Sequence, residues 1–260
     1  MASTAFPGLE GKLRHPRPRN VGRTMVVDWG YGVRAQRDLV ETGGAFVDLA
    51  KIAVGISGLL PERLLRRKLT LYRRSGIEPF PGGQFLEFAQ LHGLDGGYFA
   101  EARRVGYRWV EVSSNLASVS LEWKQEMIRE ASSRHGFEVI GEVGRKEGLA
   151  HPVPLVEDAQ ACLDAGASLI LVEAAELVSG EPHVAKEVEQ VIEALPEDVL
   201  MFELPGPWIE GVALSDIHQL FVQLAERFGA ALNAGNVAFE DVIRFEAFRR
   251  GVGVNAGKAV

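Results

Sequence analysis

Acidic, basic and amide side chains end a series of short apolar runs along this 260-residue chain. In residues 139 to 148, "VIGEVGRKEG", an apolar run ends in Glu142 and is followed by Arg145 and Lys146. Similar groups close eight runs in all: Asp28, Lys51, Gln84 after Gly82 and Gly83, Glu111 with Ser113, Glu142, Glu173, Glu203, and Asn233 with Asn236. These residues are the candidates for chemistry.

The donor atoms of this set are carboxylate oxygens, amides and lysine amines, without His or Cys. Zinc prefers nitrogen and sulfur ligands, whereas Mg²⁺ takes oxygen ligands and completes its shell with water and substrate oxygens. A Mg²⁺ ion can hold a substrate carboxylate and stabilise the enolate that forms beside it. We therefore predict Mg²⁺ as the cofactor, with Glu111, Glu142 and Glu173 as its ligands.

A lysine beside such a site can move a proton at the reacting carbon. Neighbouring charge and desolvation lower its pKa, which suits a general acid or base. We predict Lys146 in this role, with Lys51 and Glu142 as further catalytic residues. A structural alternative stays open, in which the carboxylates only neutralise Lys51 and Lys146 within a buried network.

The apolar runs alternate with longer amphipathic segments, which is typical of strand–helix units on a parallel sheet. Eight such units in this length predict an α/β fold with a single (β/α)8 TIM barrel. The carboxyl ends of all eight strands would then meet at one mouth, where the active sites of barrels lie. The expected strands are residues 24 to 28, 45 to 52, 77 to 82, 107 to 113, 137 to 143, 168 to 174, 198 to 204 and 230 to 235.

An open, doubly wound sheet is the competing architecture. Its first strand is usually followed by G-x-G-x-x-G, but this chain reads "DWGYG" from residue 28, which does not match. Residues 1 to 22 are rich in Pro and Arg without periodicity and predict a flexible N-terminal leader. Residues 23 to 260 are then the catalytic barrel domain.

Composition limits the partners and the compartment. The net charge of -7 argues against nucleic-acid binding, and the cations of residues 63 to 74 are spaced as on the exposed face of an amphipathic helix. The single Cys162 excludes an internal disulfide, and no apolar run approaches a membrane span. We expect a soluble cytoplasmic protein with a small anionic substrate. Homo-oligomerisation is an expectation by analogy with other barrels.

Several segments together resemble one known family, the phosphosulfolactate synthases. These segments, in chain order, are "FVDLAKIAVGIS", "PGGQFLEFA", "WVEVSSN", "EVGRK", "DAGASLILVEA" and "NAGNVAFEDVIRFEAFRRG". The resemblance runs from about Met25 to Lys258. It implies a barrel lyase that uses Mg²⁺ to add sulfite to phosphoenolpyruvate in coenzyme M biosynthesis. A plant heat-stress protein belongs to the same superfamily.

The resemblance also assigns roles to individual residues. It places the family's proton-transferring lysine at Lys146 and its strand-two lysine at Lys51. The other polar residues of the family pattern fall on Asp28, Glu87, Glu111, Ser113, Glu142, Glu173, Asn233 and Asn236. Among these, we predict Asp28, Ser113, Asn233 and Asn236 as substrate-binding residues.

Departures from the family pattern concern the anion pocket. Trp29 replaces a lysine, Ala175 replaces an arginine, and Gln84 replaces a threonine; Ile56 and Ser114-Asn115 differ as well. Each charge-assisted hydrogen bond contributes about 1.5 to 3 kcal/mol, so the loss of two cations weakens the binding of phosphate, carboxylate and sulfite together. We predict Gln84 and Arg145 as substrate-binding residues, with Arg145 replacing the missing cations.

Three functions therefore remain open from the sequence. The first is a Mg²⁺-dependent lyase that acts on phosphoenolpyruvate or a similar enol-forming carboxylate, with sulfite or a related nucleophile. The second is a non-catalytic, stress-related barrel protein of the same superfamily. The third is an unrelated barrel aldolase or isomerase in which Lys51 or Lys146 forms a Schiff base.

Overall fold

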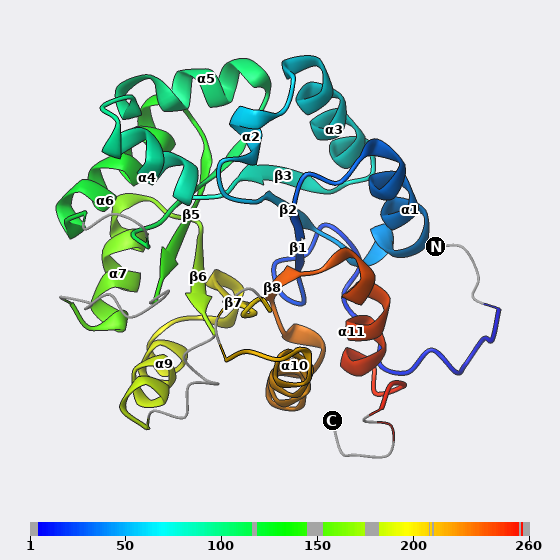
Figure 1. Cartoon of the computed structure of the whole chain (residues 1–260). Coiled ribbons are helices and arrows are strands. Elements are labelled where there is room, and N and C mark those ends of the chain that lie inside the picture. The colour runs from blue at the N-terminus through cyan, green and yellow to red at the C-terminus, as the bar shows by residue number, and fades with distance from the viewer. Residues whose placement is uncertain are drawn as a thin grey trace.

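Eight parallel strands form the centre of the molecule in the computed structural model (Figure 1). It describes residues 5–115, 119–144, 153–174, 182–207, 209, 211–254 and 256. The strand order is β3-β2-β1-β8-β7-β6-β5-β4, and β3 also packs against β4, so the barrel is nearly closed. The prediction of a (β/α)8 barrel is confirmed. The strands are β1 (Thr24–Asp28), β2 (Leu49–Ile52), β3 (Glu78–Pro81), β4 (Trp109–Val112), β5 (Glu138–Val143), β6 (Leu169–Glu173), β7 (Leu200–Glu203) and β8 (Ala234–Val237).

Helices surround this barrel (Figure 1). Helix α3 shows why they pack there: Leu65, Leu69 and Tyr72 recur at helical spacing on one buried face, while most of its arginines remain outside. The helices are α1 (Val33–Gly43), α2 (Ile56–Leu59), α3 (Glu62–Arg74), α4 (Gln84–Leu91), α5 (Tyr98–Val105), α6 (Leu121–Arg129), α7 (Leu155–Ala165), α9 (Pro182–Ala194), α10 (Leu214–Phe228) and α11 (Val242–Arg249). Within the described ranges, no helix combines the length and apolar character needed to span a membrane.

Alternation along the strands divides the core into two layers. One set of side chains faces the helices, and the other fills the barrel interior. The interior set is Met25, Leu49, Phe80, Ile140, Leu169, Leu171 and Met201, packed against Trp109. The strand positions two residues beyond several of these face the same interior at the carboxyl end. They carry Lys51, Glu111, Glu142, Glu173 and Glu203.

Strand β8 lies four residues later than its predicted start. The apolar residues that suggested a strand, Gly229–Ala231, form a 3-10 turn, and the strand begins at Ala234. Its pairing with β1 shifts register between Thr24 and Val26, which is a bulge. This shift decides which of the two predicted asparagines reaches the mouth.

The N-terminal segment crosses the amino end of the barrel. Its described part, residues 5 to 22, contains no helix or strand. Arg14 is 7% exposed and donates to Gly22 O, Thr24 Oγ1 and Phe46 O. Arg17 donates to Val47 O and Arg19 pairs with Asp48, at 2.9 and 2.8 Å. The segment is therefore tied to the barrel; its flexibility in solution stays a prediction.

Candidate active site at the barrel mouth

Three buried carboxylates converge at the carboxyl ends of β5, β6 and β7. Glu142, Glu173 and Glu203 each offer an oxygen, and these oxygens lie within 4.8 Å of one another. Their side chains are at most 2% exposed. The register explains the approach, because Glu173 and Glu203 are direct partners on adjacent strands and both face the interior. Three acids this close must share a cation or protons.

Lys51 of β2 provides one cation to this cluster. Its Nζ lies 2.9 Å from Glu111, 3.2 Å from Glu203 and 3.8 Å from Glu142. Like the carboxylates it is buried, with 6% exposure. Among the described residues that line the mouth cavity, it is the only cationic side chain. The lysine therefore contacts acidic side chains from three different strands.

Glu111 of β4 differs from the other acids in its proton affinity. Burial raises the pKa of Glu111 to about 8; Lys51 opposes this, and the nearby Glu142 and Glu203 add to it. Its Oε1 accepts a hydrogen bond from the Gly83 N–H at 2.8 Å. Burial therefore favours the protonated form of this carboxyl near pH 7.

Amide and hydroxyl groups orient the acids. Asn115 Nδ2 donates to Glu142 Oε1 at 2.7 Å, and Asn236 donates to Glu203 Oε1. Asn236 reaches Glu203 because the β8 bulge holds it at φ 55, a left-handed conformation that asparagine tolerates. Ser113 donates to the buried Glu87 at 2.5 Å.

Two glycines allow this close approach of strands and loops. A Cβ on Gly83 would lie 2.4 Å from Ser113 Oγ and 3.0 Å from Glu111 Oε1. Gly144, at φ 109, would bring a Cβ within 2.7 Å of Glu173 Cβ. Both positions therefore require glycine, which explains the double glycine after β3 and the glycine of "EVGRK".

The described residues enclose a small cavity of about 60 Å³ at the mouth. Trp29 contributes an apolar wall and is 39% exposed, while Gln84 and Asn236 add amides. Val54 also lines this cavity and adopts φ 41, an unfavourable conformation for a β-branched residue. Such strain is concentrated at functional sites, and here it lies in the turn after β2.

Two predicted substrate-binding residues lie elsewhere. Asp28 is fully buried on the helix side of β1, where it accepts from Tyr72 and Lys68 of α3, each at 2.7 Å. Its other oxygen accepts the N–H groups of Gly30 and Tyr31. Asp28 therefore anchors the turn after β1 to α3 rather than facing the mouth. The prediction missed Lys68 because it assigned all the α3 cations to an exposed face.

Asn233 lies at the opposite end of the barrel. It precedes β8, and its Oδ1 accepts the N–H of Arg23, which precedes β1. Its Nδ2 donates to Leu200 O at 2.8 Å and Glu197 O at 3.0 Å. The predicted pair of mouth asparagines is thus wrong for Asn233, whereas Asn236 lies at the mouth. The late start of β8 is the reason.

Most of the other predicted site residues lie near the acidic trio of Glu142, Glu173 and Glu203. Lys51, Glu111, Ser113, Gln84, Glu142 and Glu173 lie at or beside the mouth. Arg145, Lys146 and Ala175 lie outside the described residues. Glu203 stood among the predicted strand-end groups but not among the predicted metal ligands, and the acidic trio contains it in place of Glu111. Asn115 was identified only as a departure from a family pattern.

The donor chemistry of the trio fits a divalent metal. Its ligands are carboxylate oxygens, which suit Mg²⁺, Mn²⁺ or Ca²⁺ rather than zinc. The buried cluster could therefore hold a metal ion. Lys51 would compete with the metal for two of these carboxylates, since it already contacts Glu142 and Glu203.

The fold and the mouth define a class: (β/α)8 barrels with a buried acidic site at the carboxyl ends of the strands. Comparison with known proteins is more specific. Residues 12–254 match the family "(2R)-phospho-3-sulfolactate synthase (ComA)", and the chain belongs to this family.

The relatives span nearly the whole chain. The phosphosulfolactate synthase of Methanothermobacter thermautotrophicus is 32% identical over 250 residues, covering 92% of each chain. That of Methanocaldococcus jannaschii is 28% identical, covering 89% of this chain and 92% of the relative. Among solved structures, 3-hexulose-6-phosphate synthase from Salmonella typhimurium aligns with a TM-score of 0.53 at 12% identity, covering 91% of this chain and 97% of that one. This last likeness concerns the fold alone.

Proposed function

We propose that this chain is a lyase that adds sulfite, or a related nucleophile, to phosphoenolpyruvate or a similar enol-forming carboxylate. The observation that carries the proposal is the buried trio of Glu142, Glu173 and Glu203 beside Lys51, within a chain of the phosphosulfolactate synthase family. The relatives named phosphosulfolactate synthase supply the reaction class.

The charge of the mouth supports a requirement for a divalent cation. Among the described residues, three buried carboxylates share Lys51 there, and burial raises the pKa of the adjacent Glu111 to about 8. Carboxylates repel an anionic substrate that approaches them, and a divalent cation between them would reverse this interaction. We propose that Glu142, Glu173 and Glu203 hold Mg²⁺. When bound, the ion would neutralise charge and polarise the substrate carboxylate.

The proposed reaction forms one carbon–sulfur bond and consumes one proton. The lone pair on sulfur attacks the terminal carbon of the double bond, and the double-bond electrons move toward the carbon that bears the carboxylate. That carbon then takes a proton, giving a saturated sulfonate with the phosphate retained. Lys51, whose ammonium lies at the mouth cavity, would attract the anionic substrate and stabilise the enolate charge. Lys146 remains our prediction for the proton donor.

The lining of the mouth bears on the identity of the substrate. Trp29 stands where the family pattern has a lysine, and its side chain forms part of the cavity wall. A ring in place of a cation favours a substrate or nucleophile with less negative charge at that position. We therefore propose that carboxylate recognition is kept and that the second anionic subsite has changed.

The test uses the full chain with phosphoenolpyruvate, sulfite and MgCl₂, and follows the phosphorylated product by phosphorus NMR. We expect product with sulfite or with a less charged thiol nucleophile, and none after removal of divalent cations with EDTA. Glu173→Gln should reduce the rate at least about 100-fold if it removes a metal ligand. Glu226→Gln, which alters an exposed glutamate of α10, is the matched control and should keep the activity.

Each arm can contradict a separate part of the proposal. Undiminished turnover in EDTA would refute the metal, and undiminished turnover in Lys146→Ala would refute the role of that lysine. Calorimetry of Mg²⁺ binding to the wild type and to Glu173→Gln tests the site without turnover. Absence of Mg²⁺ binding in both would refute the metal site itself.

A second candidate function is a non-catalytic barrel protein. The observation that favours it is the contact of Lys51 with three carboxylates, together with the small cavity of about 60 Å³ among the described residues. In this case the cluster would act as a closed ion-pair network. Absence of both Mg²⁺ binding and turnover, in a chain that unfolds cooperatively, would support this candidate.

A further inference from the structure

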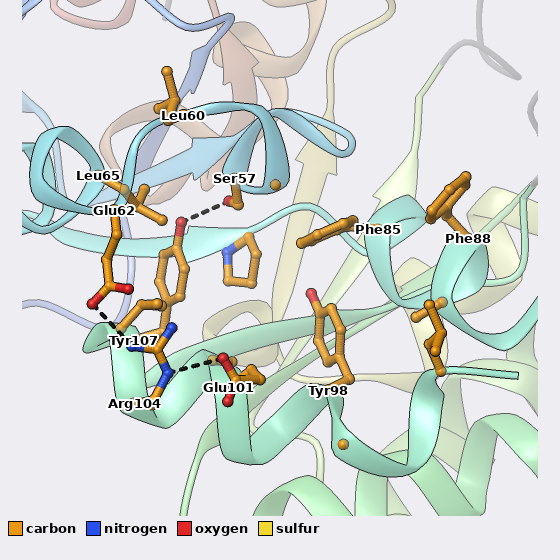
Figure 2. Close-up of a pocket in the computed structure, with 17 residues that line it drawn as sticks. Ser57, Leu60, Glu62, Leu65, Phe85, Phe88, Tyr98, Glu101, Arg104 and Tyr107 are labelled. Atoms are coloured by element: carbon orange, nitrogen blue, oxygen red, sulfur yellow. Dashed lines mark hydrogen bonds and ion pairs between the residues drawn. The ribbon is translucent and has the colours of Figure 1, made fainter. Parts of the chain in front are cut away.

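A second cavity, of about 510 Å³, lies outside the barrel between α2, α4 and α5 (Figure 2). Its wall is mostly apolar and includes Leu65, Pro81, Phe85, Ala89 and Val105. Cavities of roughly 300 to 1,000 Å³ with apolar walls and a few polar groups are typical of small-molecule sites. The size and lining of this cavity therefore suit a small organic ligand.

Tyr98 supplies the polar group that points to a ligand. Its side chain is 8% exposed, and its hydroxyl is buried without a hydrogen-bond partner among the described residues. Figure 2 shows this hydroxyl directed toward the space beside Phe85. Tyr107, on the same cavity, is satisfied, because its hydroxyl pairs with Ser57 at 2.8 Å. A buried hydroxyl without a partner is costly, and a ligand in this cavity would remove that cost.

The charged residues of the rim limit the charge of the ligand. Arg104 binds Glu62 and Glu101, each at 2.9 Å (Figure 2), and Arg66 also binds Glu62 at 2.7 Å. These four side chains together carry no net charge. Burial raises the pKa of the Tyr98 hydroxyl well above its usual value, so the phenol remains a neutral donor. The described lining of the cavity therefore offers neither an unbalanced cation for an anionic ligand nor an unbalanced anion for a cationic one.

We propose that this cavity binds a small, uncharged and mainly apolar molecule with one hydrogen-bond acceptor, such as a ketone or an ester. The apolar body of the ligand lies against Phe85 and Pro81, and its acceptor takes the hydrogen of the Tyr98 hydroxyl. The site is separate from the barrel mouth and does not depend on the proposed lyase activity. It would place a second ligand next to α4, the helix that begins at Gln84 of the mouth.

Two dyes test this inference on the full chain. Nile red is uncharged and has a carbonyl acceptor, whereas diphenylhexatriene is an uncharged hydrocarbon without one. We expect both to bind with saturable fluorescence. Tyr98→Phe should weaken Nile red roughly 3- to 10-fold, the equivalent of one hydrogen bond, and leave diphenylhexatriene unchanged. Equal effects on both dyes would refute the role of the hydroxyl.

A pair of glycines on one turn offers a matched test of location. Gly97 lines the cavity and Gly96 does not, and a Cβ on either would meet nothing within 4 Å. We expect Gly97→Leu to reduce the binding of both dyes at least 10-fold, and Gly96→Leu and Gly97→Ala to leave it unchanged. Circular dichroism confirms folding of each variant. The proposal would be overturned if Gly97→Leu bound both dyes as tightly as the wild type does. It would also be overturned if dye binding to the wild type disappeared at higher protein concentration, because a second copy of the chain would then cover the cavity.

Discussion

The ammonium of Lys51 lies among carboxylates from β4, β5 and β7, so its removal changes the charge of the whole mouth. Lys51→Met should lower the free energy of unfolding by about 3 to 5 kcal/mol in EDTA, because the buried acidic side chains lose a cation that contacts them. The loss should shrink when MgCl₂ is added, since the trio can then bind the ion instead. Urea denaturation in each buffer measures both effects.

Lys186→Met, which removes an exposed lysine of α9, is the control for this prediction and should change the stability little. If MgCl₂ does not reduce the loss of stability in Lys51→Met, the carboxylates do not bind the ion. The same result would favour the closed ion-pair network over a metal site.

The raised pKa of Glu111 gives the mouth a pH-dependent stability. Its pKa of about 8 in the folded chain exceeds the ordinary glutamate value of 4.5, so folding favours the protonated form. This contribution is complete below about pH 4.5 and is lost as the pH rises toward 8. Glu111→Gln mimics the protonated acid, so the variant should gain stability relative to the wild type between pH 5.5 and 8. Urea denaturation at four pH values measures the free energy of unfolding of both proteins. The prediction is wrong if the difference between Glu111→Gln and the wild type does not change with pH.

The candidate site was predictable where a polar residue interrupts an apolar strand on its inward face. Lys51, Glu111, Glu142 and Glu173 satisfy this condition, and the structure brings them together or adjacent. Asp28 could not be assigned in this way, because "TMVVD" is buried on both faces and its alternation is invisible in the sequence. The partner that turns Asp28 outward, Lys68, is 40 residues away and is recognisable only in three dimensions.

The alternation of strands and helices was sufficient to predict the barrel, but not every boundary of its strands. The β1 bounds are as predicted, and the strand predicted at residues 45 to 52 forms only Leu49–Ile52. The error at β8 matters more, because "GAALNAG" is apolar and small and matches a strand or a turn equally well. Its bulge and the φ of Asn236 depend on pairing with β1, which no local pattern reports.

A buried ion pair links α6, α7 and β5 directly behind the acidic trio. Lys124 Nζ contacts both oxygens of Asp158 at 3.0 Å and donates to the main-chain oxygen of Glu142 at 2.5 Å. Lys124→Met and Asp158→Leu should each lower the free energy of unfolding by about 3 to 5 kcal/mol, because each removes the opposite charge from a buried ion pair. The double variant should lose less than either single variant. A double-mutant cycle by urea denaturation measures this coupling.

Additive losses in that cycle would contradict the ion pair as the source of the stability. The prediction also concerns the site, since the pair holds the strand end that carries Glu142. We expect Lys124→Met to weaken Mg²⁺ binding even though Lys124 does not reach the mouth cavity, which a titration of the folded variant can measure.

The two ends of the whole molecule differ in how they are closed. The carboxyl end is an acidic mouth with one lysine among its described residues, whereas the amino end is covered by residues 5 to 22 through their arginines. Arg14 contributes most there, because it reaches Glu246 of α11 at 2.8 Å as well as the β1 hydroxyl of Thr24. The N-terminal segment thus connects the first strand to the last helix.

Two truncations separate the anchored part of this segment from the rest. The described residues that a chain beginning at Glu10 lacks are exposed, Phe6 and Leu9 by more than 70%, so this chain should keep its melting temperature. A chain beginning at Arg23 loses Arg14, Arg17 and Arg19 and should lose about 3 kcal/mol, or roughly 6 to 12 °C. Differential scanning calorimetry measures both. Equal melting temperatures would mean that the arginine contacts contribute nothing to stability and that the whole segment behaves as a loose leader.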